Sequence, residues 1–496
     1  MKKLNFALLF AGVIMLANLF FRLLDQSKLL KYFPFDNAND ISSYMAQIHF
    51  MKVCGFHGFC PYWYNGFIAF LHSPPGWYFF AQPFYLIFND VKYTAYFLMV
   101  LQFVLAFAVI FYFGRMLGLS RLKRTAFFFF LFANAMAVGN FIRLGRLHEM
   151  LAWIPFIALF AIIYHYRNRI IDLKFMIISA LLFAAIIITY QSVAILALFV
   201  IAGFLLAKRK EWHKIIIIFG SSVALTAFWW WPFMNSLMAT SNIIVSVKQG
   251  QWILQFANAD MSSKLVLSFI LPLVMVFLFV QFWKTRKNEE KLIFYLPVLL
   301  LGVLFLLRVT AFIPVLNYIF PDPYLFFFSF FALFFLLKIN YEKLGKLGNV
   351  IIVAVVLFSI ASVMVNVLHT PKFIIPEGTA VEVENSLKKL DGSFMIAGDF
   401  PSTVYGKAYY SYAPVYLNLT TPFGWYPEST SKEYLLHIDG FKESITERNC
   451  SKLIEEIKFL KLKYIITNSD NCSFLDACGL KLTNKIEDVC TMSASF

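Results

Sequence analysis

Residues 4–21 read LNFALLFAGVIMLANLFF, an apolar run that follows Lys2 and Lys3. A run of about 18 or more apolar residues can cross the hydrocarbon core of a bilayer as a helix. The next residues are Arg22-Leu23-Leu24-Asp25, which do not form the small-residue cleavage site of a signal peptide. We therefore expect an uncleaved membrane anchor here.

Apolar runs of this kind recur along the chain. Of its 496 residues, 60% are hydrophobic and 14% are charged, whereas a soluble domain is about 45–50% apolar and about 25% charged. The polar Thr189-Tyr190-Gln191-Ser192 divides one run that is too long for a single crossing. We predict an α-helical polytopic membrane protein with about eleven transmembrane helices, at about 4–22, 91–113, 125–142, 148–166, 173–189, 192–207, 215–235, 265–282, 292–308, 323–338 and 348–368.

The basic residues favour one side of this arrangement. Alternate connecting segments hold 20 Lys and Arg residues in about fifty positions, at 1–3, 114–124, 167–174, 208–214, 283–291 and 338–347. Because positive charge is retained on the cytoplasmic side, we predict a multi-pass plasma-membrane protein with a cytoplasmic N-terminus and an extracytoplasmic C-terminal region. The net charge of +15 then belongs to short loops and does not indicate a nucleic-acid partner.

The C-terminal region, residues 370–496, predicts a small extracytoplasmic α/β domain after a transmembrane domain of residues 1–369. Residues 394–397 and 464–467 have the pattern of strands, and 452–462 that of a helix. All six cysteines fall on the predicted outer side, where disulfides form. We expect Cys54–Cys60 in the first loop as the simplest pair, whereas the pairing among Cys450, Cys472, Cys478 and Cys490 stays open. Three glycosylation sequons begin at Asn418, Asn449 and Asn471.

The outer loop 23–90 is far longer than a connector needs. It contains Asp36 and Asp40, four residues apart, and then Ile41–Val53, whose apolar residues share one helical face. We expect this amphipathic helix to lie in the membrane surface. Asp40 fits two roles that are compatible with each other: it could cap the helix, or it could act in catalysis.

Other polar and aromatic residues gather on the same predicted side. Trp63 and Tyr64 precede Gly66 in an aromatic turn, which fits either an interfacial belt or stacking on a sugar. Arg143 and Arg146, three apart, would share a helical face and could hold a phosphate; snorkelling arginines with an internal Arg–Glu pair are the alternative. Further candidates at this side are His148, Glu149 and Arg308.

The arrangement resembles the GT-C superfamily of integral-membrane glycosyltransferases, and within it prokaryotic, archaeal members. In that family an Asp at the head of the first-loop helix is followed four residues on by Tyr or His, as in Asp40-Ile-Ser-Ser-Tyr44. Its Trp-Tyr-x-Gly element and Pro-Pro pair match Trp63–Gly66 and Pro74-Pro75. An Arg–Glu segment that opens the fourth span matches 143–149. The resemblance rests on residues 1–170; the later spans agree in topology.

The resemblance implies transfer of a sugar from a polyprenyl (dolichyl) phosphate to a glycan, protein or lipid acceptor at the outer surface. It implies Asp40 as general base with Asp36 assisting or holding a divalent metal (Mg or Mn), in an inverting single displacement. The phosphate would contact Arg143, Arg146 and Arg308, and the substrates would contact His148, Glu149, Trp63, Tyr64, Tyr44 and His49. We expect these groups to share one pocket that opens to lipid.

Departures from the family limit the expected reaction. The C-terminal region has no WWD-type motif of oligosaccharyltransferases; Gly424-Trp425-Tyr426 is the nearest match and lacks the acid. No second-loop Asp-x-Asp appears either. Transfer of a single hexose or pentose is therefore expected. The alternatives are a polytopic transporter or lipid flippase, and a non-catalytic assembly subunit with the same fold.

Overall fold

The structure is a computed structural model, and it describes residues 2–35, 40–239, 262–286, 290–398 and 406–494. By its internal contacts the chain divides into two units. Unit 1 comprises Met1–Asp25, Met99–Trp230 and Val247–Pro371. Unit 2 comprises Gln26–Leu98, Trp231–Ser246 and Lys372–Phe496. The first outer loop thus groups with the C-terminal region, whereas a domain boundary at residue 369 stays a prediction.

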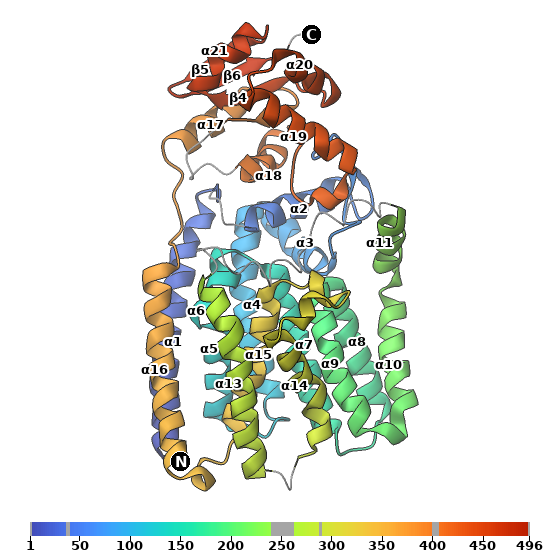
Figure 1. Cartoon of the computed structure of the whole chain (residues 1–496), viewed down its shortest axis with the longest axis vertical. Coiled ribbons are helices and arrows are strands. Elements are labelled where there is room, and N and C mark those ends of the chain that lie inside the picture. Colours follow the sequence, from blue (N-terminus) through green and yellow to red (C-terminus); the bar gives the residue numbers. More distant parts are fainter. Residues whose placement is uncertain (1, 36–39, 240–261, 287–289, 399–405, 495–496) are drawn as a thin grey trace. The chain divides into compact units, whose positions relative to one another are not determined.

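Unit 1 consists of apolar helices (Figure 1). Its elements, some of which continue into unit 2, are α1 (Lys2–Gln26), α4 (Val91–Phe113), α5 (Arg121–Phe132), α6 (Ala135–Ala137), η2 (Val138–Arg143), α7 (Leu147–Tyr166), α8 (Leu173–Thr189), α9 (Gln191–Ala207), η3 (Arg209–Glu211), α10 (Trp212–Leu225), α11 (Ala227–Ala239), α13 (Ser262–Arg286), α14 (Leu292–Leu306), η6 (Val309–Ala311), η7 (Leu316–Tyr318), α15 (Pro321–Lys338), η8 (Tyr341–Leu344) and α16 (Lys346–His369).

Every predicted span overlaps one of these helices or a run of two or three consecutive ones. Among the described residues, six helices are long and apolar enough to cross a membrane, or up to eight spans if each bent pair counts as one. The helices α8 and α14 are apolar but shorter, with 17 and 15 residues. The polytopic helical fold is confirmed, and the protein is a multi-pass membrane protein; the count of eleven crossings stays a prediction.

The phenylalanine-rich helix α15 forms the centre of unit 1. Proline at its first position suits a helix start, because that position needs no amide donor. Phe326 of α15 lies with its ring 4.7 Å from Trp153 of α7, and Phe335 lies 5.2 Å from Phe279 of α13. These contacts bury α15 and α7, whereas α4 and α16 expose most of their apolar surface, as expected of lipid-facing helices.

Helices α1 and α16 lie side by side (Figure 1). Polar side chains join them: Asn366 Nδ2 donates to Asn18 Oδ1 at 3.0 Å, and Arg22 Nη2 donates to the Thr370 carbonyl at 3.0 Å. Within a bilayer such interhelical hydrogen bonds satisfy polar groups that have no water to contact. The first and last predicted spans are therefore paired.

In unit 2 the first outer loop folds into short elements. They are η1 (Ser27–Leu30), α2 (Ile41–Val53), the strand pair β1 (Phe59–Cys60) and β2 (Phe67–Ile68), and α3 (Gly76–Phe88). A disulfide joins Cys54 to Cys60, which confirms the expected pair. It ties the end of α2 to β1.

The C-terminal region of unit 2 is the predicted α/β domain. Strands β3 (Phe394–Ile396) and β4 (Tyr464–Asn468) pair in parallel, and both were predicted. The hairpin of β5 (Lys481–Ile486) and β6 (Val489–Ser493) was not predicted, and it completes a sheet of order β3-β4-β6-β5. The helices are α17 (Thr379–Leu387), α18 (Gly406–Leu417), η9 (Pro427–Ser429), α19 (Lys432–Thr446), α20 (Cys450–Phe459) and α21 (Ser469–Ala477).

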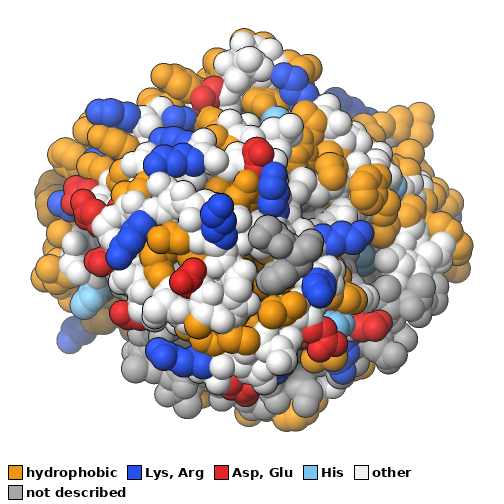
Figure 2. Space-filling model, turned by 90° about the horizontal axis from the view of Figure 1, so that it is seen from above, with side chains coloured by type: hydrophobic (Ala, Val, Ile, Leu, Met, Phe, Trp, Pro, Cys, Tyr) orange, Lys and Arg blue, Asp and Glu red, His pale blue; other side chains and the backbone are white. Residues whose placement is uncertain are grey.

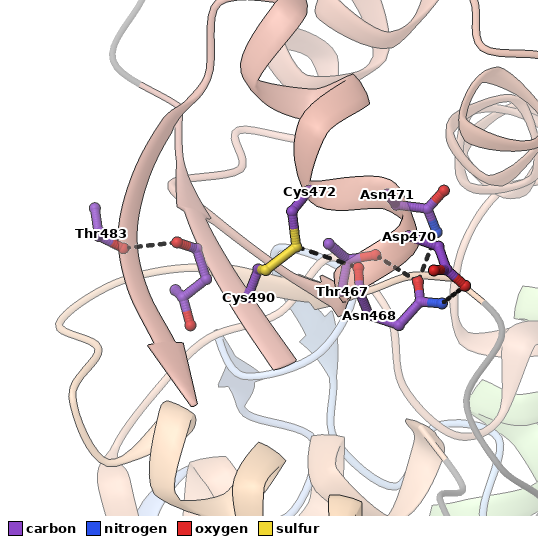
Figure 3. Close-up of a disulfide and its surroundings, with 8 residues drawn as sticks. Thr467, Asn468, Asp470, Asn471, Cys472, Thr483 and Cys490 are labelled. Atoms are coloured by element: carbon purple, nitrogen blue, oxygen red, sulfur yellow. Dashed lines mark hydrogen bonds between the residues drawn. A yellow bond between two sulfur atoms is a disulfide. The ribbon is translucent and has the colours of Figure 1, made fainter. Parts of the chain in front are cut away.

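Two disulfides cross-link this domain: one joins α20 to the residue that follows α21, and the other joins α21 to the sheet. Cys450 of α20 pairs with Cys478, and Cys472 of α21 pairs with Cys490 of β6 (Figure 3). Beside the second bridge, Asn471 Nδ2 donates to Asn468 Oδ1 at 2.7 Å. On the face seen in Figure 2, Lys and Arg side chains are interspersed with Asp and Glu, in keeping with the near-neutral charge of this region.

Candidate functional site

Asp40 immediately precedes α2, and its carboxylate does not cap that helix. Its backbone is in the right-handed helical region (φ −74°, ψ −15°), and its side chain makes no capping hydrogen bond. The helix start is satisfied differently, since Ser43 Oγ donates to the Asp40 carbonyl at 2.7 Å. The capping interpretation of this side chain is therefore wrong. Asp40 as a whole is half-buried.

The helix α2 has the predicted bounds, but it is not a surface helix. Ten of its residues are buried, including the polar Ser42, Ser43 and Gln47. It packs against α3 and α18, with the rings of Tyr44 and Trp77 5.7 Å apart. The expectation that α2 lies in the membrane surface is wrong, because α3 of the same loop and α18 of the C-terminal domain cover it. His49, near its end, is hydrogen-bonded to the Tyr85 hydroxyl at 3.2 Å.

The aromatic turn after the Cys54–Cys60 bridge anchors the C-terminal domain. Trp63 has no exposed surface, and its Nε1 donates to the Tyr410 carbonyl at 2.7 Å. Asn65 Nδ2 donates to the Leu460 carbonyl at 2.8 Å. Tyr64 is also buried, which raises the pKa of its phenol. In this conformation Trp63 and Tyr64 serve packing, and neither the interfacial-belt nor the sugar-stacking interpretation describes their contacts.

Three residues of the C-terminal domain that the sequence did not single out individually lie with Asp40 in unit 2. The Tyr426 hydroxyl is 3.3 Å from Ser43 Oγ. Burial, and next the charge of Asp40, raise the pKa of Tyr426, so its phenol stays protonated at neutral pH. Burial lowers the pKa of Lys407 and raises that of Glu428, although their opposite charges act against both shifts. The available signal was Gly424-Trp425-Tyr426, the segment closest to a family motif.

In unit 1, the two arginines do not share one helical face, contrary to expectation. Arg143 ends the π-helical turn η2, and Gly145 then adopts a positive φ of 69°. Arg146 lies outside the helix, just before α7 begins. The chain therefore turns between the two arginines, and regular helical spacing does not relate them.

Arg146 forms an ion pair that the sequence did not predict. Its Nη1 lies 2.5 Å from Asp322 Oδ2 at the start of α15. The carboxylate at that helix N-terminus is favoured by the helix dipole. Glu149, the partner expected in an internal Arg–Glu pair, accepts a hydrogen bond from Trp153 Nε1 at 3.3 Å. His148 and Glu149 are both buried.

Arg308, the third candidate arginine, contacts residues of α13. It has a positive φ of 63°, and its Nη2 donates to Ser268 Oγ of α13 at 2.6 Å. Its guanidinium lies 4.3 Å from the ring centroid of Phe269. These contacts fix the residue after α14. Its expected contact with a donor phosphate stays a prediction.

Binding of a divalent metal was one of the two roles considered for Asp36, and the described residues do not test it. Within those ranges, no three His, Cys, Asp or Glu side chains gather so that they could hold a metal ion. Asp36 lies outside the described residues. No step below is therefore assigned to a metal.

The candidate residues fall into two groups. Asp40, Tyr44, His49, Trp63 and Tyr64 belong to unit 2. Arg143, Arg146, His148, Glu149 and Arg308 belong to unit 1.

Comparisons with known proteins bear on the fold. No protein-family model matches the sequence, and neither does any curated protein sequence. Among solved structures, the archaeal oligosaccharyltransferase AglB from Archaeoglobus fulgidus, in complex with an inhibitory peptide and a dolichol-phosphate, matches with a TM-score of 0.60 at 12% identity, over 92% of this chain and 69% of that one.

Two further solved structures agree. ArnT from Cupriavidus metallidurans bound to undecaprenyl phosphate matches with a TM-score of 0.53 at 10% identity, over 96% of this chain and 97% of that one. The arabinofuranosyltransferase AftD from Mycobacteria matches with a TM-score of 0.58 at 14% identity, over 99% of this chain but 40% of that larger one. The likeness therefore extends over nearly the whole chain, well beyond the N-terminal residues that carried the resemblance in sequence. The chain therefore shares the fold of these solved structures, as the resemblance in sequence predicted.

Proposed function

We propose that the protein is a membrane glycosyltransferase that moves one sugar from a polyprenyl-phosphate donor to an acceptor on the extracytoplasmic face. The GT-C fold over more than nine-tenths of the chain is the observation that carries the proposal. Similar structures bind dolichol-phosphate in one case and undecaprenyl phosphate in another. A donor of the same chemical class is the simplest substrate for this chain.

The proposed orientation follows from charge and cysteine chemistry. The basic connecting segments would face the cytoplasm. The three disulfides suit an oxidising compartment on the other side. The first outer loop and the C-terminal domain would then meet the donor at the outer leaflet.

The proposed chemistry is a single displacement. Asp40 takes the proton of an acceptor hydroxyl as its oxygen attacks the anomeric carbon. The bond from that carbon to the phosphate oxygen breaks, and the lipid phosphate leaves with the electron pair through an oxocarbenium-like transition state. The anomeric configuration is inverted, because attack and departure occur on opposite faces.

The departing phosphate gains negative charge, which cations can stabilise. Arg143 and Arg146 are proposed for this role, with Arg308 as a further contact. Arg146 can serve both Asp322 and a phosphate, since a guanidinium carries five N–H donors. His148, Glu149, Tyr44 and His49 are proposed to orient the substrates, whereas Trp63 and Tyr64 would support the site by packing.

The test is made with purified protein in vesicles that contain radiolabelled polyprenyl-phosphate hexose or pentose and a panel of hydroxyl acceptors. The proposal predicts a covalent glycosylated product together with released polyprenyl phosphate. Transbilayer movement of intact donor without a product would identify a flippase instead. No product and no movement with any donor would favour a non-catalytic subunit.

Variants at the arginines test the phosphate role. Replacing Arg143 by Gln should lower kcat/KM for the donor by about tenfold to a hundredfold, the order of one charge-assisted hydrogen bond. The exposed Arg115, which lies in a basic connecting segment, gives the matched control, and Arg115→Gln should leave transfer unchanged. Equal effects of the two substitutions would remove Arg143 from the proposed role.

A further inference from the structure

The C-terminal domain contacts the first loop both before and after Asp40. Before the motif, the ring of Phe35 stacks on Tyr409 of α18 with centroids 4.2 Å apart, and Phe33 packs edge-on against Tyr412 at 5.3 Å. After it, Ser43 meets Tyr426. Asp40 therefore lies between two anchors that one stretch of the C-terminal domain supplies, from α18 to η9.

The hydroxyl groups at the second anchor connect Tyr426 with the backbone of Asp40. Ser43 Oγ gives its single hydrogen to the Asp40 carbonyl at 2.7 Å. The same oxygen can still accept a hydrogen bond, and it lies 3.3 Å from the Tyr426 hydroxyl. A hydrogen bond from Tyr426 to Ser43 would support the turn that carries Asp40.

Tyr426 occupies an unfavourable backbone conformation at this contact. Its φ is +59° and its ψ is 69°, in the left-handed region, which costs a residue with a side chain about 1–2 kcal/mol. Its neighbour Gly424 is pressed against the indole of Trp63, where an added Cβ would lie 2.6 Å from Trp63 Cγ. Strain of this kind persists where surrounding contacts require it, and often at functional sites.

We propose that the C-terminal domain completes the proposed transferase site by positioning Asp40. The Tyr426 hydroxyl acts through Ser43 to fix the turn that carries Asp40. Tyr426 is a positioning residue, and the assignment of Asp40 as the base rests on the proposed function. The domain would thus be part of the reaction centre.

The first test needs no substrate. In the full-length protein, Tyr426→Phe should make the amides of Ser43 and Tyr44, which donate to the Asp40 carbonyl, exchange hydrogen about tenfold faster, as loss of one supporting hydrogen bond implies. The control Tyr409→Phe removes a buried hydroxyl of α18 that donates to the Ala380 carbonyl instead. Exchange that is equally slow in both variants would overturn the Tyr426 role.

The second test uses the reaction. Tyr426→Phe should lower kcat about tenfold with little change in the donor KM. Tyr409→Phe keeps the ring that stacks on Phe35, so it should leave both constants unchanged. A kcat of Tyr426→Phe equal to that of Tyr409→Phe would overturn the Tyr426 role. A wild-type chain that transfers no sugar would count against the proposed function alone, since the exchange comparison stands without turnover.

Discussion

The ion pair between Arg146 and Asp322 allows a quantitative prediction. Its Nη1 and Oδ2 atoms are 2.5 Å apart, and the side chains are 19% and 3% exposed. The pair joins the residue before α7 to the first turn of α15, the central helix of unit 1. Replacing Arg146 by Gln leaves a carboxylate buried beside a neutral group, which costs about 3–5 kcal/mol.

Substitution of the other partner, Asp322, should cost less stability. Asp322→Asn leaves Arg146 with one-fifth of its side chain exposed, so that water can solvate part of the charge; we expect about 1.5–3 kcal/mol, the usual value of a hydrogen bond to a charged group. The double variant pairs two neutral amides and leaves no buried charge. Its loss should fall short of the sum of the single losses by about 2 kcal/mol or more.

The assay is reversible unfolding of the four proteins in mixed micelles, with the free energies combined in a double-mutant cycle. Losses that add to within about 0.5 kcal/mol would refute the ion pair as an energetic link. A sugar-transfer assay separates the structural role of Arg146 from a role in binding the donor. If Arg146 also binds the donor phosphate, the double variant should regain stability relative to Arg146→Gln without regaining transfer.

Three further predictions concern unit 2. Gly424→Ala should destabilise the contact between the first loop and the C-terminal domain by about 1–3 kcal/mol, because the new Cβ would meet Trp63; limited proteolysis should then release the C-terminal domain sooner, and a cleavage rate like that of the wild type would contradict this packing. Replacing Cys450 and Cys478 by Ala should cost about 3–4 kcal/mol, since the bridge closes a loop with a sequence separation of 28; an unchanged unfolding midpoint would show that the bridge adds nothing. Burial lowers the pKa values of His49, His57 and His72. The unfolded chain therefore binds more protons, and the free energy of unfolding should fall as pH drops below about 6.5. The variant with Gln at all three positions should lose less of this free energy between pH 7 and pH 5, and equal losses in the two proteins would refute the predicted pH dependence.

The sequence predicted the helices well because bilayer-spanning runs are long and nearly free of charge. The spacing of apolar residues predicted the bounds of α2, but it did not predict which elements pack against the helix. The sequence showed an apolar face on Ile41–Val53, and the membrane was the obvious partner for it. In the structure, α18 and α3 cover the helix. The residues of α2 and α18 are more than 350 positions apart in the chain, so their contact leaves no pattern in the local sequence.

The site residues were predicted unevenly for similar reasons. Asp40 was found because it begins a helix in a loop otherwise poor in acids, and its two possible roles could not be separated by spacing. The hydrogen bond that replaces the cap comes from Ser43, which spacing does not favour over the carboxylate. The partner of Arg146 is Asp322, 176 residues away. Nearby Glu149 was the only partner that local sequence could suggest.

The sequence did not predict the hairpin of β5 and β6, because β5, the strand at the edge of the sheet, is largely polar. Lys481–Ile486 alternates weakly and is mostly exposed, whereas Val489–Ser493 is mostly buried. The pairing of four cysteines within forty residues could not be chosen from spacing, because three connectivities are possible. The sheet and the helices around it decide among them.

The central claim is that Asp40 is the base of a sugar transfer, and the single-turnover rate of Asp40→Asn at saturating donor tests it most directly. Asp90 provides the matched control, because its carboxylate does cap a helix: Oδ1 accepts from the Lys92 amide at 2.7 Å, and Asn can take over that role. The account predicts that Asp40→Asn lowers the rate by about 10²–10⁴-fold, with folding intact and donor binding retained, while Asp90→Asn transfers sugar at the rate of the wild type. Transfer by Asp40→Asn at a rate near that of the wild type would contradict it.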